Sequence, residues 1–511
     1  MIYSYIEGLI KEACKAGIVQ ERDHIYLRNQ LLGLLKLNVF VLPKEDLPEV
    51  SLTDFVDLIT DYAVDQGIVQ PFLVEKDIFG ANLMNIFTSK PSEISMLFWG
   101  YYNQSPEKAT NYFYELSQAS NYIQTKRLKK NICYKASTEY GELDITINLS
   151  KPEKDPKEIA RAKLYPESET KYPKCLLCVE NEGFIGHLNH PARANHRIIP
   201  LELGEERWYL QYSPYLYYNE HCILLSEEHR DMKINFSTFY RILDFVRQFP
   251  HYFAGSNADL PIVGGSILTH DHYQGGQYEF PMAKAKEENH FHLAKFPSIE
   301  AMTIRWPLSV MRLRSSNLFE LATAAGFILE VWKTYNDETQ NILSYTGSTR
   351  HNTITPIARM RNGLYELDLV LRNNRTSDEH PLGIFHPHAD VHHIKKENIG
   401  LIEVMGLAVL PPRLREDLLD VKKYIQTGEN VVKKEHLSWA QELKAHYEPS
   451  VDLNEYVNQA IAMKFVKGLE DCGVFKRTES GRRAFLKFIR TINKIKKGVC
   501  HHDVNNKEEY L

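Results

Sequence analysis

The stretch that decides how this chain is interpreted runs from Gly264 to Gly276 and reads GGSILTHDHYQGG. The β-forming residues that lead into it predict a strand, and alternate residues of a strand share one face. We therefore expect His270, His272 and Gln274 to line one wall together. The flanking glycines allow a ligand to approach the backbone closely, as phosphate binding often requires. The stretch has no Walker or dinucleotide fingerprint.

A histidine in such a strand is suited to group transfer. Neutral imidazole can attack phosphorus, and a phosphorylated ring nitrogen stays reactive enough to pass the group on. Gln274 could then donate a hydrogen bond to a phosphoryl oxygen. The competing interpretation is that His-x-His is a surface pair or part of a metal site. This stretch alone leaves both interpretations open.

The sequence around this stretch predicts an α+β fold. Short β-like runs with one helix surround it, whereas helical periodicity dominates both ends of the chain. We expect an N-terminal helical domain, a connection made of a strand and a Pro-rich segment, a catalytic α+β half, a second α+β half and a helical C-terminal region. In residue numbers these are 1–130, 131–174, 175–315, 316–412 and 413–511.

Composition excludes several classes of protein. The 511 residues carry a formal charge of −5, which provides no basic field for gripping nucleic acid or an anionic membrane. No apolar run approaches the ~18 residues that span a bilayer, and the N-terminus lacks the pattern of a signal peptide. The seven cysteines are sparse and odd in number, which argues against a secreted disulfide framework. We expect a cytoplasmic protein with no nucleic-acid partner and no membrane association.

Two clusters of potential metal ligands stand out. Cys175 and Cys178 form a Cys-x-x-Cys pair, which suits either tetrahedral zinc or a redox dithiol. The pair follows a Pro-rich linker instead of lying at a strand-to-helix junction, so we favour metal. The second cluster, HPHADVHH at 386–393, is either a metal site or a solvated turn.

Several stretches resemble the galactose-1-phosphate uridylyltransferases, specifically the second, longer class found in Gram-positive bacteria. They are TEYGELDITINLSKPEKDPK, CLLCVENEGFIGHLNHPARANHRIIP, QYSPYLYYNEH and GSNADLPIVGGSILTHDHYQGG. The resemblance covers nearly the whole chain. It implies two histidine-triad-like α+β halves, an activity on nucleotide sugars and a homodimer.

The resemblance assigns the catalytic residues. The first class carries a His-Pro-His-Gly-Gln motif whose second histidine is uridylylated, and His272 is similar to that nucleophile. Gln274 matches the glutamine that contacts the transferred phosphoryl group. This chain departs from the motif by having Asp271 for the proline and Tyr273 for the glycine.

The resemblance also implies a structural zinc held by Cys175, Cys178, His229 and His270. The first class holds an iron through a Leu-His-x-His-Phe strand as well. The most similar strand here, Leu367–Leu371, lacks both histidines. We therefore expect no second metal.

The substrate contacts implied by resemblance are distributed over two loops. Asn189 is similar to a uridine-contacting asparagine, and Asn257, Gly265 and Ser266 are similar to diphosphate-contacting positions. Arg193 and Arg197 are candidate phosphate partners on chemical grounds, because a guanidinium fork matches phosphate oxygens.

These residues together predict a uridylyltransferase that exchanges UMP between UDP-glucose and galactose 1-phosphate through a uridylyl-His272 intermediate. The helical N-terminal domain would help to keep water from that intermediate. One alternative is another histidine-triad-type nucleotidyltransferase or phosphorylase. The other is a non-catalytic zinc-binding interaction protein.

Overall fold

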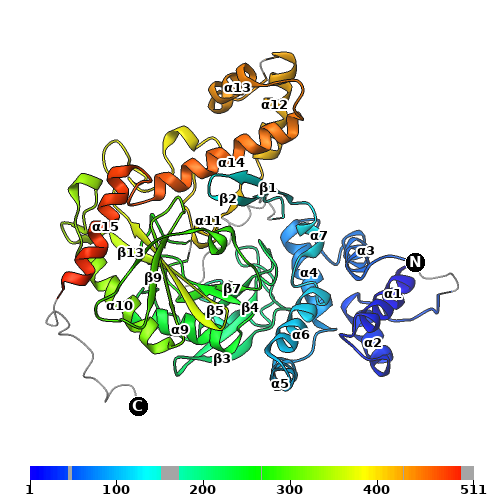
Figure 1. Cartoon of the computed structure of the whole chain (residues 1–511). Coiled ribbons are helices and arrows are strands. Elements are labelled where there is room, and N and C mark those ends of the chain that lie inside the picture. Colours follow the sequence, from blue (N-terminus) through cyan, green and yellow to red (C-terminus); the bar gives the residue numbers. More distant parts are fainter. Residues whose placement is uncertain (44–48, 151–171, 266, 430, 496–511) are drawn as a thin grey trace. The chain divides into compact units, whose positions relative to one another are not determined.

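The computed structural model describes residues 1–43, 49–150, 172–265, 267–429 and 431–495 (Figure 1). The chain divides into two compact units. The first comprises Met1–Asn131, Leu149–Asp231 and Thr269–Gln277, and the second comprises Ile132–Asn148, Met232–Leu268 and Tyr278–Leu511. Both helices and strands are abundant, so the predicted α+β class is confirmed. The five predicted domain ranges stay predictions, and residues 151–171 of the predicted connection lie outside the described residues.

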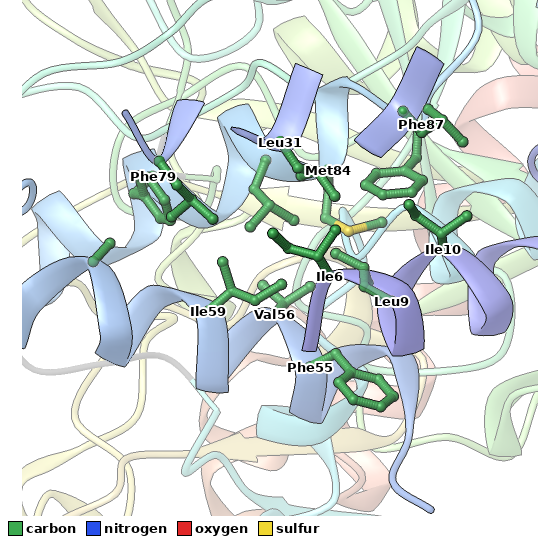
Figure 2. Packing of buried hydrophobic residues seen from close by; sticks show 14 of the residues in the cluster. Ile6, Leu9, Ile10, Leu31, Phe55, Val56, Ile59, Phe79, Met84 and Phe87 are labelled. Atoms are coloured by element: carbon green, nitrogen blue, oxygen red, sulfur yellow. The ribbon is translucent and has the colours of Figure 1, made fainter. Parts of the chain in front are cut away.

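The first unit opens with a set of helices. They are α1 (Ile2–Lys15), α2 (His24–Leu34), α3 (Leu52–Asp65), α4 (Leu73–Asn85), α5 (Pro91–Tyr102), α6 (Pro106–Ala119) and the short α7 (Thr125–Leu128). Apolar residues three and four positions apart give α1 and α3 one buried face each. Figure 2 shows Ile6, Leu9, Phe55 and Ile59 from these two helices packing with Met84 of α4.

Four strands of an antiparallel sheet follow in the same unit. Their order is β3 (Ile199–Leu203), β4 (Glu206–Tyr212), β5 (Cys222–Ser226) and β7 (His272–Gly276). Leu225 of β5 lies opposite His272 of β7, and Ile223 lies opposite Gln274. The expected strand therefore exists, but it begins at His272 and His270 precedes it.

Buried polar contacts join the helices to this sheet. The Arg197 guanidinium donates hydrogen bonds to the backbone carbonyls of Thr88 and Ser89 and to the side chain of Asn85, all at the end of α4 or just after it. The Tyr212 hydroxyl donates to the Thr110 carbonyl in α6. The Arg197 guanidinium, a candidate phosphate partner on chemical grounds, therefore donates its hydrogen bonds to protein groups. These contacts also join the helices and the sheet in one core.

We expect Arg197→Ala to destabilise the protein by about 3 kcal/mol, because several buried carbonyl oxygens would lose their donor. Denaturant unfolding measures this loss. Arg483→Ala is the matched control, since Arg483 is exposed and pairs with exposed Glu479, and it should change stability by less than about 0.5 kcal/mol. An Arg197→Ala protein as stable as wild type contradicts the assignment.

The second unit contains a larger antiparallel sheet. Its strand order is β6 (Phe253–Gly255), β13 (Asn352–Arg361), β14 (Leu364–Asn373), β10 (Val310–Ser315), β9 (Glu300–Ile304) and β8 (Glu287–Phe291). Helix α10 (Leu318–Thr334) packs on β10, β13 and β14, and α9 (Phe236–Gln248) packs beside it on β13.

The middle of this sheet carries buried charge. Both carboxylate oxygens of Asp368 accept hydrogen bonds from Arg312, and one also accepts from Arg359. Glu366 pairs in the same way with Arg314 and Arg359. Asp368 belongs to the strand that resembles the iron-binding strand of the first class. Its carboxylate is committed to ion pairs within the sheet.

The remaining strands and helices of the second unit join distant parts of the sequence. β1 (Ile132–Thr138) pairs with β2 (Gly141–Ile147), and β2 pairs in parallel with β15 (Leu407–Leu410). The C-terminal helices are α12 (Leu414–Thr427), α13 (Lys434–His446), α14 (Leu453–Cys472) and α15 (Glu479–Lys494), after the short α11 (Leu401–Val404). In the part of the chain that the structure describes, no helix is long and apolar enough to cross a membrane.

Candidate active site and metal centre

His272 is the first residue of β7, and its ring is held in one orientation. Its Nδ1 lies 2.8 Å from the carbonyl oxygen of His270. A carbonyl oxygen can only accept, so Nδ1 carries the proton and Nε2 keeps its lone pair. Among the described residues Nε2 has no hydrogen-bond partner. Burial lowers the pKa of His272 to about 4, which agrees with a neutral ring.

Asp271 and Tyr273 are the two residues at which this chain departs from the motif of the first class, and each makes contacts with neighbouring side chains. The Asp271 carboxylate lies 3.4 Å from the Arg230 guanidinium, and the Asp271 backbone N–H donates to the Arg230 carbonyl. The Tyr273 ring stacks on Trp208 of β4 with centroids 4.7 Å apart. Because residues 271 and 273 alternate with His272, these contacts anchor β7 without occupying the face that carries His272 and Gln274.

Gln274 has a partner that the sequence did not predict. Its side-chain Oε1 lies 3.1 Å from Nε2 of His221, which precedes β5. His221 is buried between the rings of Tyr217 and Tyr218. Residues 221, 223 and 225 alternate along the chain, so His221 shares the face of Gln274. The pairing of β5 with β7 brings them together, and no local pattern of residues around His221 indicates it.

The four predicted metal ligands lie together in the first unit. One ligand atom from each of Cys175, Cys178, His229 and His270 lies within 4.8 Å of all the others. The two sulfurs are 3.5 Å apart. Nδ1 of His270 lies 3.4 Å and 3.7 Å from the Sγ atoms of Cys175 and Cys178, and Nδ1 of His229 lies 3.1 Å from Cys178 Sγ.

These separations fit tetrahedral coordination. Zinc bonds of about 2.3 Å to sulfur and about 2.0–2.1 Å to nitrogen place ligand atoms roughly 3.3–3.8 Å apart. Nε2 of His270 lies 2.9 Å from the Ser226 carbonyl, so it carries the proton and Nδ1 presents its lone pair to the thiols. The backbone N–H of Leu177 donates to Cys175 Sγ. The donor set and its supporting hydrogen bonds therefore fit a metal ion.

The predicted nucleotide residues of the first unit follow the cysteine pair. Asn181 donates from its amide to the carbonyls of Cys175 and Cys178 and accepts a 2.6 Å hydrogen bond from His190. Asn189 is exposed beside His190. This contact ties the loop that carries Asn189 to the metal cluster.

Arg193 lies further along the same loop. Its guanidinium lies over the ring of Tyr122, 5.6 Å from the ring centroid, and Nη1 donates to the Ala192 carbonyl. The side chain is half-buried. Unlike Arg197, it keeps guanidinium N–H groups for a further acceptor, since five are available on each arginine.

The other predicted substrate residues belong to the second unit. The Oδ1 atom of Asn257 accepts a hydrogen bond from the Leu401 backbone N–H, at 2.9 Å. A Cβ atom at position 265 would lie 2.6 Å from Nδ2 of Asn257, so a larger residue there would require this amide to move. Ser266 lies outside the described residues.

The histidine-rich segment 386–393 includes histidine rings that are hydrogen-bonded to other protein groups. The rings of His388 and His392 contact the carbonyls of Ile384 and Pro387, and His386 contacts Asn398. Within the described ranges this segment forms no group of three metal ligands. The described residues hold two further potential ligand groups: exposed Glu287, His290 and Glu300, and Asp417, Glu435 and His436.

Together, a histidine with a free Nε2 atom, a neighbouring amide and a Cys2His2 group of potential metal ligands suit an enzyme that transfers a group. Comparison with known proteins identifies the family. Residues 17–231 match the family model for the N-terminal domain of galactose-1-phosphate uridyl transferase, and residues 245–441 match the model for its C-terminal domain. The chain belongs to this family, and it is a transferase enzyme. The alternative of a non-catalytic interaction protein was therefore wrong.

Similar proteins cover almost the full length. A galactose-1-phosphate uridylyltransferase of Clostridium perfringens is 52% identical over 493 residues, which is 96% of this chain and 98% of that protein. One from Fusobacterium nucleatum is 52% identical over 96% of this chain and 99% of its own length. One from Streptococcus mutans is 51% identical over 92% and 96%. Among solved structures, yeast Ap4A phosphorylase Apa2 matches 60% of this chain and 90% of its own at 13% identity, with a TM-score of 0.32.

Proposed function

We propose that this enzyme exchanges UMP between UDP-glucose and galactose 1-phosphate by double displacement, with His272 as the nucleophile. The observation that carries the proposal is the orientation of the His272 ring. Its Nδ1–H donates to the His270 carbonyl at 2.8 Å, which leaves Nε2 unprotonated and without a partner among the described residues.

In the first half-reaction, the lone pair of His272 Nε2 attacks the α-phosphorus of UDP-glucose. The N–P bond forms while the bond from this phosphorus to the bridging oxygen breaks, and glucose 1-phosphate leaves with that oxygen. The ring then carries a positive charge. The His270 carbonyl, which already accepts from Nδ1, stabilises this charge by a stronger hydrogen bond.

In the second half-reaction, a phosphate oxygen of galactose 1-phosphate attacks the phosphorus of the uridylyl-imidazole. The N–P bond breaks, UDP-galactose leaves and Nε2 regains its lone pair. Charge on the nonbridging oxygens must be stabilised in both steps. The Gln274 side-chain amide, two residues along the same face of β7, is the donor that we assign to this task.

The nucleotide and sugar phosphate need further contacts. We assign Asn189 to uridine, Arg193 to a phosphate, and Asn257, Gly265 and Ser266 to the diphosphate. Gly265 lies close to the Asn257 amide, and the Leu401 backbone N–H holds that amide by a hydrogen bond. Both observations support assigning Asn257 and Gly265 to the same part of the substrate.

We assign the Cys175, Cys178, His229 and His270 group to zinc, since two thiolates and two imidazoles are its preferred ligands. When bound, zinc would supply structural cross-linking of three chain segments. His270 then acts at two points: its imidazole is a ligand and its carbonyl fixes the His272 ring. We propose in addition a cytoplasmic location, a homodimer and a contribution of the N-terminal helices to excluding water from the intermediate.

Intact-protein mass spectrometry after brief incubation with UDP-glucose alone tests the proposal. We expect the wild type to gain the mass of one uridylyl group and to lose it again when galactose 1-phosphate is added. His272→Gly should gain no mass. If another nucleotide labels the wild type and UDP-glucose does not, the proposed donor is wrong, and if no donor labels it, the covalent route is wrong.

A further inference from the structure

His221 is a buried, ordered histidine to which neither the family resemblance nor the proposed chemistry gives a role. Its ring lies 4.5 Å from the ring of Tyr218 and 5.6 Å from that of Tyr217, measured between centroids. Its backbone carbonyl accepts a hydrogen bond from Ser213 N–H. Its side-chain Nε2 lies 3.1 Å from Oε1 of Gln274.

The loop that carries His221 is packed tightly against β7. The Tyr218 hydroxyl donates to the Gly275 carbonyl at 3.1 Å. Gly276 has φ of +149°, and a Cβ atom there would lie 2.7 Å from the Glu220 carbonyl oxygen and 2.9 Å from the Tyr218 ring. Glycine at 276 therefore lets residues 218–221 lie directly on the strand that carries the proposed catalytic residues.

The direction of the hydrogen bond follows from the atoms that meet. Oε1 of a glutamine can only accept, so Nε2 of His221 must donate. Burial lowers the pKa of His221 to about 4, and the neutral ring has one proton for this purpose. With Oε1 fixed in this way, the NH2 group of Gln274 is turned away from His221 and available as a donor.

We propose that His221 is a positioning residue, which fixes the Gln274 amide so that its NH2 group, and not its carbonyl oxygen, faces the phosphoryl oxygens. This inference rests on the proposed function. An amide rotated by half a turn would present Oε1 to anionic oxygens and repel them. A fixed amide avoids that orientation and needs no reorganisation when charge develops in the transition state.

A double-mutant cycle tests the inference, with the single-turnover rate of uridylylation by UDP-glucose as the readout. His221→Phe keeps an aromatic ring but removes the donor. We expect it to lower the rate at saturating UDP-glucose by about 10–100-fold, with less than about a threefold change in the UDP-glucose concentration for half-saturation. In the Gln274→Ala background, the same substitution should change the rate by less than about twofold, because no amide remains to be positioned.

Two further variants distinguish an effect on the position of the Gln274 amide from an effect on the stability of the protein. His221→Gln retains an N–H donor and should keep the rate within about fivefold of wild type. His351→Phe is the matched control: His351 is also buried, and its Nε2 contacts the Thr346 hydroxyl at 2.9 Å, so its loss should leave the rate unchanged. If His221→Phe does not fold, His221→Met takes its place in the cycle.

The outcomes distinguish this inference from the function on which it rests. If the wild type forms no uridylyl adduct, the proposed function fails and the inference with it. If the wild type forms the adduct, two results overturn the inference alone: equal rate losses with and without Gln274, or no loss when Gln274 is present.

Discussion

Replacing His272 by alanine is expected to lower the multiple-turnover rate by about 10⁴-fold or more, because nucleophiles of covalent catalysis leave little residual activity when removed. Water cannot replace Nε2, since the second half-reaction requires UMP to stay attached to the enzyme. The measurement is UDP-galactose formation from UDP-glucose and galactose 1-phosphate. Uridylylation of the variant by UDP-glucose, followed by intact mass, should give no adduct.

The same variant should keep its metal and its fold. The only hydrogen bond of the His272 ring in the described chain is the short-range one to the His270 carbonyl, and the ring belongs to no ligand group. Metal content and melting temperature should therefore match the wild type closely. His446→Ala is a control for removing a histidine, because His446 is exposed and its ring contacts the Glu442 carbonyl within α13. A His272→Ala enzyme that retains more than about 1% of activity contradicts the assignment.

The sequence predicted the parts of the site that lie close together in the chain. His272 and Gln274 share a strand, and the two-residue period of a strand puts them on one face. Cys175 and Cys178 have the spacing of a zinc ligand pair. The resemblance to the family then supplied His229 and His270. Local spacing was sufficient for the two cysteines, whereas the two histidines required the family resemblance, and the structure brings all four ligand atoms together.

Other features depend on contacts between distant segments and carry no local pattern. His221 meets Gln274 because β5 pairs with β7. β2 pairs with β15 across more than half of the chain. Arg197 has the chemistry of a phosphate ligand, yet the groups that surround it are backbone carbonyls from the end of α4. The type of a side chain indicates what it can bind, and only tertiary packing decides which partner it has.

The strand containing Asp368 illustrates the same limit. The sequence indicated that two histidines of the first class are missing there, but not which residues Asp368 would contact. Strands β10 and β13 flank β14, and their arginines point to the same face as Asp368 and Glu366. Ion pairs across three strands therefore occupy this part of the sheet. To predict these ion pairs, one must know the order and register of the three strands, and the sequence of one strand does not give either.

Replacing Cys178 by serine is expected to remove bound zinc, with a loss of affinity of at least about 100-fold. Even the loss of a group that only orients a ligand costs 10–100-fold, and Cys178 supplies a ligand atom itself. Its sulfur lies close to ligand atoms of both His229 and His270. Elemental analysis of the purified protein measures the loss. Cys133→Ser is the matched control, since Cys133 is exposed and belongs to no ligand group.

The Cys178→Ser variant, once it lacks zinc, should also lose activity. Such a loss would show that the metal helps to hold the catalytic residues in place. The ligands join three segments, at 175–178, 229 and 270, and the last lies directly before the nucleophile. Without the metal, the His270 ring loses the bond that a metal would make to Nδ1 and keeps its hydrogen bond to Ser226, so its backbone carbonyl would fix Nδ1 of His272 less firmly. We expect uridylylation to slow by about 10-fold or more, since small displacements of a reacting group have effects of this size. A Cys178→Ser enzyme that lacks zinc yet forms the adduct at the wild-type rate would show that the metal does not help to position His272.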